Sequence, residues 1–129
     1  MTLDLWILVA TVVFTWLLIM VDATPSILNN GLPWAVGNRE ETPDPDGVYG
    51  RIHRCSLNMQ ENLPIFAALV LVAHVSGEAD AMSTLGAEIF LGARIVHAGV
   101  YFAGIPWART LIWSVSIAGM GLIVYSLFG

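Results

Sequence analysis

The chain has 129 residues, of which 57% are hydrophobic and only 12% charged, and its mean hydropathy is +0.73. Soluble domains carry about 25% charged residues, so this composition predicts one membrane domain over residues 1–129. The net charge is −5, from ten acidic residues against five basic ones, all of them arginine, which excludes a basic nucleic-acid surface. With a single cysteine, Cys55, the sequence offers neither an intrachain disulfide nor a cysteine-based metal site, and we predict no metal.

The first predicted helix covers residues 3–28. Its segment from 3 to 21 is apolar apart from Asp4 and the threonines. At ~1.5 Å per residue, about 19 residues cross the ~30 Å hydrocarbon core of a bilayer. A cleaved signal peptide is the competing interpretation, but the segment has no basic start and is longer than the apolar core of a typical signal peptide.

A polar loop is predicted over residues 29–49, where glycine, proline, asparagine and acidic residues gather. The acidic run from Glu40 to Asp46 is interpreted as a solvated loop, because its carboxylates lack the spacing of a cation site.

Three further helices are predicted at residues 50–76, 81–103 and 107–128. Pro64 lies within the first of these and is expected to kink it. The links at 77–80 and 104–106 are short, so consecutive helices should be antiparallel neighbours. The predicted fold is therefore an all-α integral membrane four-helix bundle.

The arginines predict how the bundle sits in the membrane. Four of the five lie next to the first and third loops: Arg39, Arg51, Arg54 and Arg109. The positive-inside rule then places the 29–49 loop in the cytoplasm and both termini outside. The absence of lysine favours a bacterial inner membrane.

The second helix carries a polar stripe at the end next to the 29–49 loop. At ~100° per residue, its members fall within roughly 80° of one another on the helix. They are Arg51, Arg54, Asn58 and Glu61.

A second polar face is predicted on the third helix. Arg94, His97 and Tyr101 follow the spacing i, i+3 and i+7 and lie within about 60°, while small residues, Gly92 and Gly99 among them, form a separate face suited to close helix approach.

Ionisable groups at membrane depth cost at least ~2.5–3.5 kcal/mol each and are normally paired inside the protein. We therefore expect Asn58 and Glu61 to be the partners of Arg94. One interpretation is an Arg–Glu pair that only fixes helix register. The other is an anionic ligand, because the arginines at this end outnumber the acids.

The remaining reactive residue types carry weaker signals. His53 lies off the polar stripe and His74 near the opposite membrane face, so both are interpreted as structural or interfacial. Cys55 is interpreted as a small buried apolar residue rather than a nucleophile.

The two polar faces resemble the signatures of the MAPEG family, the membrane-associated proteins in eicosanoid and glutathione metabolism. Its second-helix pattern, Arg-x-x-x-Asn-x-x-Glu followed by Pro-x-Phe, is matched by Arg54, Asn58, Glu61, Pro64 and Phe66. Its third-helix pattern is matched by Arg94, His97 and Tyr101, and the arginine near the start of the fourth helix by Arg109. Ser56, Leu57 and Trp113 depart from the residues of some members.

The resemblance implies a homotrimer that binds glutathione as a co-substrate between subunits. Arg109 would stabilise the glutathione thiolate and Thr110 would assist with its hydroxyl. The remaining contacts to glutathione would come from Arg51, Arg54, Asn58, Glu61, Arg94, His97 and Tyr101.

The predicted function is that of a membrane-bound glutathione transferase or peroxidase acting on lipophilic electrophiles or lipid hydroperoxides that arrive from the bilayer. Two alternatives stay open. A non-catalytic member of the same fold would bind an anionic lipid or act as a scaffold. A small transporter would use Glu88 for ion coupling.

Overall fold

A computed structural model describes residues 1–39 and 47–129. The described residues form five helices: α1 (Leu3–Asn30), α2 (Leu32–Val36), α3 (Gly47–Ser76), α4 (Ala81–Ala103) and α5 (Pro106–Phe128). Four of them, α1, α3, α4 and α5, are long and apolar enough to cross a membrane. The predicted all-α membrane four-helix bundle is confirmed.

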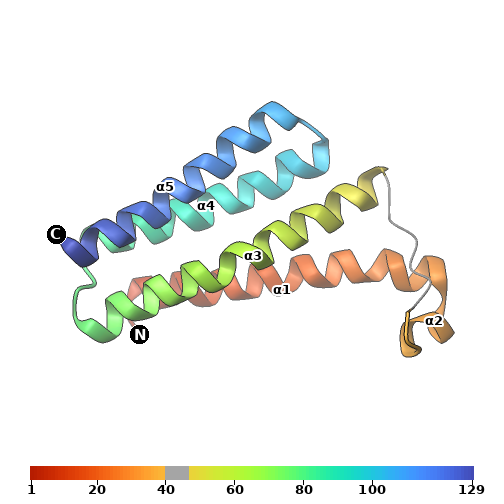
Figure 1. Cartoon of the computed structure of the whole chain (residues 1–129), viewed down its shortest axis with the longest axis horizontal. Coiled ribbons are helices and arrows are strands. Elements are labelled where there is room, and N and C mark those ends of the chain that lie inside the picture. Colours follow the sequence, from red (N-terminus) through yellow and green to blue (C-terminus); the bar gives the residue numbers. More distant parts are fainter. Residues whose placement is uncertain (40–46) are drawn as a thin grey trace.

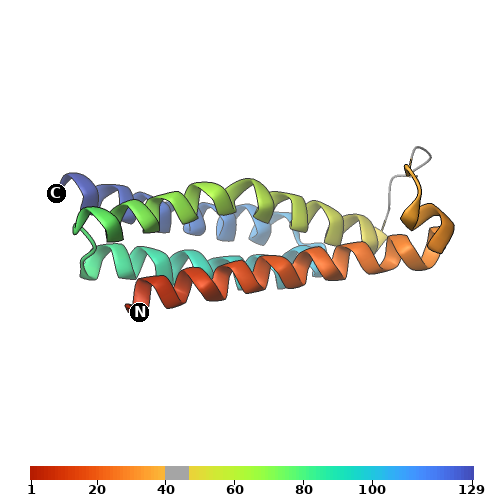
Figure 2. The ribbon, with the colours of Figure 1, turned by 90° about the horizontal axis from the view of Figure 1, so that it is seen from below.

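The four long helices run side by side, antiparallel to their neighbours in sequence (Figures 1 and 2). The most extensive contacts are between α4 and α5 and between α1 and α3. Both termini and the α3–α4 turn lie at one end of the bundle, which we call the terminal end (Figure 1). At the other end lie α2, the start of α3 and the α4–α5 turn. We call it the arginine end, because Arg39, Arg51, Arg54 and Arg109 belong to it.

The helix bounds differ from the predicted ones around the first loop. α1 extends to Asn30, where Gly31 ends it with φ +85°, a conformation that favours glycine. α2 follows inside the predicted polar loop, with proline in its first turn, where a missing N–H is tolerated. α3 begins at Gly47 and continues past Pro64. The acidic run from Glu40 to Asp46 lies outside the described residues.

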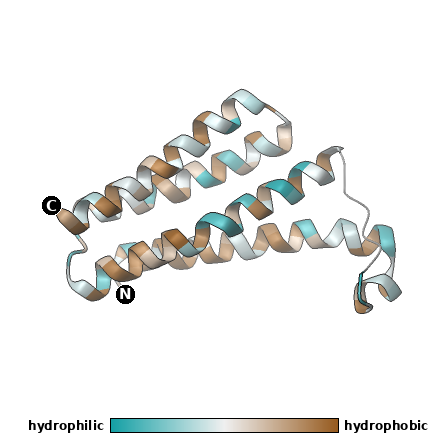
Figure 3. Cartoon of the chain, in the orientation of Figure 1, coloured by the Kyte–Doolittle hydropathy of each residue, from teal (hydrophilic) through white to brown (hydrophobic). Residues whose placement is uncertain are grey.

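The pattern of hydropathy along α3 separates the two ends of the bundle. Hydrophilic residues gather in the half of α3 nearer the arginine end, and the other half is hydrophobic (Figure 3). In the core, Phe66 of α3 stacks on Phe90 of α4, with ring centroids 4.1 Å apart. Both rings are fully buried. This contact joins the α1–α3 pair to the α4–α5 pair.

The closest helix approach is between α4 and α5, at a pair of glycines. A Cβ atom at Gly119 would lie 2.7 Å from the carbonyl oxygen of Gly86, and one at Gly86 would lie 2.5 Å from that of Gly119. At Gly92 and Gly99, which the sequence predicted as a packing face, a Cβ atom would meet nothing within 4 Å in the described chain. The prediction that this face packs closely against another helix is therefore wrong within the chain. Periodicity shows which residues share a face but not which face meets a neighbour.

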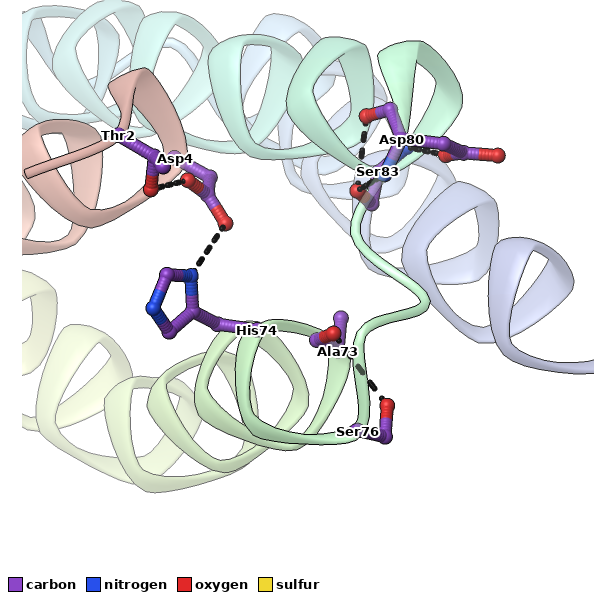
Figure 4. Close-up of polar contacts among 7 residues, drawn as sticks. All are labelled: Thr2, Asp4, Ala73, His74, Ser76, Asp80 and Ser83. Carbon is purple, nitrogen blue, oxygen red and sulfur yellow. Dashed lines mark hydrogen bonds and ion pairs between the residues drawn. The ribbon is translucent and has the colours of Figure 1, made fainter.

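Two histidine–aspartate pairs join α1 to α3, one at each end of the bundle. At the terminal end, His74 of α3 and Asp4 of α1 point toward one another, with Nδ1 of the histidine 3.9 Å from a carboxylate oxygen (Figure 4). The Thr2 hydroxyl donates to the same carboxylate. At the arginine end, Nδ1 of His53 lies 3.0 and 3.1 Å from the two oxygens of Asp22. Both histidines thus hold α3 against α1.

The start of α4 is fixed by a reciprocal cap beside the first of these pairs. The backbone N–H of Ser83 donates to the Asp80 carboxylate, and the backbone N–H of Asp80 donates to the Ser83 hydroxyl, both at 2.9 Å (Figure 4). Such a capping box satisfies two helix N–H groups that have no partner within the helix. It sets where α4 begins, and with that the depth of the polar residues farther along it.

Candidate functional site

Arg94 of α4 is the most deeply buried charged residue of the described chain, with 1% of its surface exposed. Its Nη2 donates to the side-chain oxygen of Asn58 at 2.5 Å, and its Nε lies 3.3 Å from the sulfur of Met59. Its Nη1 has no partner among the described residues. Thioether sulfur is a weak acceptor, so the guanidinium is only partly satisfied. Burying a cation without an anion is unfavourable, so this arrangement favours an anionic ligand.

His97 lies one turn farther along α4 and is 2% exposed. Its Nδ1 likewise has no hydrogen-bond partner in the described part of the chain. Its ring meets that of Tyr101 edge to face, with centroids 5.3 Å apart and an interplanar angle of 67°. Two buried nitrogens, on Arg94 and His97, thus lie on one face of α4 with hydrogen-bonding capacity to spare.

A cleft of about 270 Å³ opens beside these side chains. Three helices line it: α3 contributes one residue, α4 two and α5 three. The lining residues are Asn58, His97, Tyr101, Arg109, Thr110 and Trp113. The guanidinium carbon of Arg109 lies 4.8 Å from the centroid of the Tyr101 ring. This cation–π contact holds the Arg109 charge at the cleft.

The exposure of the lining residues gives the cleft a closed side and an open side. Tyr101 and His97 are buried, Arg109 is half-buried and Thr110 is exposed. The Thr110 hydroxyl donates to the carbonyl of Pro106 at 3.3 Å, which leaves its oxygen able to accept a hydrogen bond. A ligand that enters from the side of α5 would therefore meet Thr110 and Arg109 before the buried groups of α4.

Six of the nine predicted site residues come together here: Arg94 joins through Asn58, and the other five line the cleft. The predicted Arg94–Asn58 contact is present, but Arg94 does not contact Glu61. Arg54 and Glu61 are exposed on α3, and the described residues give neither of them a hydrogen bond or ion pair.

Arg51, also predicted as a site residue, is not among the residues that line the cleft. Its Nε donates to the backbone carbonyl of Phe102 at 3.2 Å, in the last turn of α4. A carbonyl in that turn has no partner within its own helix, so Arg51 stabilises the end of α4. Gly104 follows with φ +76° and ends the helix. Arg51 thus joins α3 to α4 beside the cleft without lining it.

Two residues near the site were not predicted for it. Trp113 lines the cleft one turn after Arg109. The i, i+4 spacing of the two residues indicates that they share a helix face, and it could have predicted this position. Met59 reaches Arg94, although it adjoins the polar stripe without belonging to it.

Cys55 is buried, as predicted, with 1% of its surface exposed. The Ser56 hydroxyl accepts a hydrogen bond from Gln60 at 2.9 Å and is fully buried.

No metal-binding cluster of three or more histidine, cysteine or acidic residues is found in the part of the chain that the structure describes.

Searches of curated proteins and of solved structures give no match. A family model, that of the MAPEG family, matches residues 3–129, which is essentially the whole chain. The order of the matched motifs and the four membrane helices agree with that match. The chain belongs to the MAPEG family.

Proposed function

We propose that the protein is a membrane-bound glutathione-dependent transferase or peroxidase that acts on lipophilic electrophiles or lipid hydroperoxides. One observation carries this proposal: buried nitrogens of Arg94 and His97 have no hydrogen-bond partner among the described residues. They lie beside a cleft that His97 and Arg109 line. Glutathione supplies two carboxylates for such groups and a thiol whose reactive form is an anion.

The residues at the cleft have separate roles in this proposal. Arg94 and Asn58 hold a glutathione carboxylate at the closed side of the cleft, and His97 and Tyr101 complete its hydrogen bonds. Arg109 lies near the open side, where its charge favours the thiolate over the thiol. Thr110 donates a hydrogen bond to the same sulfur after its hydroxyl turns from Pro106.

The chemistry then needs the bound thiolate and a substrate from the bilayer, and reduction needs a second glutathione as well. In transfer, the sulfur forms a bond to an electrophilic carbon, and the leaving group or the opened ring takes up a proton. In reduction, two glutathione thiols supply two electrons to a lipid hydroperoxide, which yields the lipid alcohol, water and glutathione disulfide. The apolar outer face of α5 lets such substrates approach from the membrane.

The exposed polar residues of α3 support a shared site in a homotrimer. Arg54 and Glu61 lie on the surface of the bundle, where a second copy can use them. A mixing experiment tests this. Oligomers assembled from Arg54→Leu and Arg94→Leu chains should regain part of the glutathione binding that each variant alone has lost. No recovery in mixed oligomers would place both residues in the site of one chain.

The catalytic role is tested by titration of the bound thiol. Ultraviolet absorbance of the thiolate, followed against pH, should give a pKa below the ~8.5 of a free thiol in the wild type, reverting in Arg109→Leu. Arg109→Lys, which keeps the charge, should revert only in part. An unshifted thiol in the wild type would favour the alternative function, a non-catalytic member that binds an anionic lipid with the same cationic groups.

The membrane placement is part of the proposal. The protein lies in a bacterial inner membrane, with the arginine end facing the cytoplasm and both termini on the outer side. The glutathione site is therefore on the cytoplasmic side. This is tested by introducing a cysteine at Thr2 or at Asn38 and adding a membrane-impermeant thiol reagent to intact cells. Only the cysteine at Thr2 should react.

A further inference from the structure

A second recess lies on the side of α3 away from the cleft, at the arginine end. It has a volume of about 250 Å³ and is bounded by α1, α2 and α3, and it shares no lining residue with the cleft. Its polar lining residues are Asp22, Ser26, Trp34, Arg39 and His53. The recess is therefore lined by a carboxylate, a guanidinium, a hydroxyl, an indole and an imidazole.

The length of α1 places this recess at the depth of the lipid head groups. α1 has 28 residues. At ~1.5 Å per residue, the stretch from Leu3 to Val21 already spans about 28 Å, close to the ~30 Å of the hydrocarbon core. The turns from Asp22 to Asn30 therefore extend into the head-group region. Trp34 on α2 follows at the level where membrane tryptophans gather.

The two charges of the recess are held by separate parts of the chain. Asp22 on α1 is fixed by His53 of α3, whose Nδ1 lies 3.0 Å from the nearer oxygen. Arg39, beyond the end of α2, donates from Nε and Nη2 to the carbonyl of Ala35 and lies 4.9 Å from the centroid of the Trp34 ring. Both side chains are thus oriented by neighbouring groups before any ligand binds.

Such a recess matches a head group that carries charges of both signs. A phosphate accepts hydrogen bonds from Arg39 and from the Ser26 hydroxyl, while an ammonium donates to the carboxylate of Asp22. Isoleucine side chains of α1 line the same recess and suit the first carbons of the acyl chains, namely Ile19 and Ile27. A head group with phosphate alone would meet the Asp22 carboxylate without a cation to offset it.

We propose that this recess is a binding site for a phospholipid whose head group carries a phosphate and a primary ammonium. A primary ammonium has N–H groups to donate to Asp22, whereas a quaternary ammonium has none. The aromatic contact that a quaternary ammonium prefers is already made at Trp34 by Arg39. The site is independent of the glutathione cleft and does not rest on the proposed activity.

Native mass spectrometry tests the proposal on the whole protein. Delipidated protein is mixed with equal amounts of phosphatidylethanolamine, phosphatidylglycerol and phosphatidylcholine of the same acyl chains. We expect phosphatidylethanolamine to be retained about tenfold over the other two, a difference of about 1.4 kcal/mol. Equal retention of the three lipids, or preference for phosphatidylglycerol, would overturn the proposal.

Two variants and one matched control locate the effect. Asp22→Asn should abolish the preference for the ammonium, and Arg39→Gln should lower retention of phosphatidylethanolamine. Asp4→Asn is the control, because it changes the other carboxylate of α1 that faces a histidine of α3. If Asp22→Asn does not fold, Arg39→Gln still reports on the recess, since Arg39 is exposed. An unchanged preference in the folded variants would refute the assignment.

The source of the ligand is tested separately. Soluble phosphoethanolamine carries the same charges without acyl chains, so an equal concentration should not displace the bound phospholipid. Its displacement of the lipid would show that the recess takes a small cytoplasmic metabolite instead, which would overturn the assignment to a bilayer lipid.

Discussion

Replacing Gly119 by alanine should force α4 and α5 apart. The new Cβ atom would lie 2.7 Å from the Gly86 carbonyl oxygen and 2.9 Å from the Phe90 backbone nitrogen. Both contacts are with backbone, so no side chain can turn away and one helix must move. Overpacking of this kind costs about 1–3 kcal/mol, and the better helix propensity of alanine recovers up to about 1 kcal/mol. The net loss should be about 1–2 kcal/mol.

The matched control is Gly121→Ala, two residues farther along α5, where a Cβ atom would meet nothing within 4 Å. It gains helix propensity without a clash, so its stability should stay the same or rise by up to about 1 kcal/mol. Unfolding in detergent titrated with sodium dodecyl sulfate, followed by circular dichroism, gives both free energies. Equal effects of the two substitutions would refute the close approach of α4 and α5 at Gly119.

Three further substitutions test other contacts. Arg51→Met removes the hydrogen bond to the Phe102 carbonyl and should cost about 1 kcal/mol, with faster amide hydrogen exchange confined to the end of α4. Cys55 should resist maleimide labelling until the protein unfolds, and Cys55→Ser should lower stability by about 1–3 kcal/mol, because a hydroxyl replaces a buried apolar group. His74→Ala removes the imidazole facing Asp4 and should destabilise the protein, an effect that Asp4→Asn in the same chain should reduce; additive losses in the double variant would contradict the pairing.

Much of the fold follows from the sequence because each membrane helix must satisfy its backbone internally and reach across a bilayer of fixed thickness. Long apolar runs separated by glycine, proline and charged residues therefore indicate both the number of helices and the up-and-down order. α2 was missed because a helix of five residues makes too short a pattern. Its proline and tryptophan are equally compatible with a loop at the membrane surface.

The polar face of α4 was predictable for the same physical reason as the fold. A buried arginine and histidine at i and i+3 must share a face, so Arg94 and His97 had to point to one side. Their partner was harder to predict. Asn58 and Glu61 differ by about 60° around α3, and the predicted stripe is wider than the line along which two helices meet. Only the relative rotation of α3 and α4 brings Asn58 to Arg94 and leaves Glu61 exposed.

The contacts between α1 and α3 lay outside what a single sequence can show. The His53–Asp22 and His74–Asp4 pairs depend on how far one helix slides along the other, and no local spacing encodes that register. Arg51 illustrates the same limit, since its role depends on where α4 ends. Its membership of a polar stripe predicted a ligand contact, and the structure shows in addition that its Nε donates to a carbonyl of the neighbouring helix.

The measurement that tests the proposed function most directly is calorimetry of glutathione binding to the purified protein, compared with Arg94→Leu. Loss of two hydrogen bonds from a charged group, each worth about 1.5–3 kcal/mol, should weaken binding at least a hundredfold. Arg39→Leu, which changes an arginine outside the cleft, should bind glutathione like the wild type. Binding by the wild type that Arg94→Leu abolishes is the predicted result, whereas equal affinity in the two folded proteins would contradict the site.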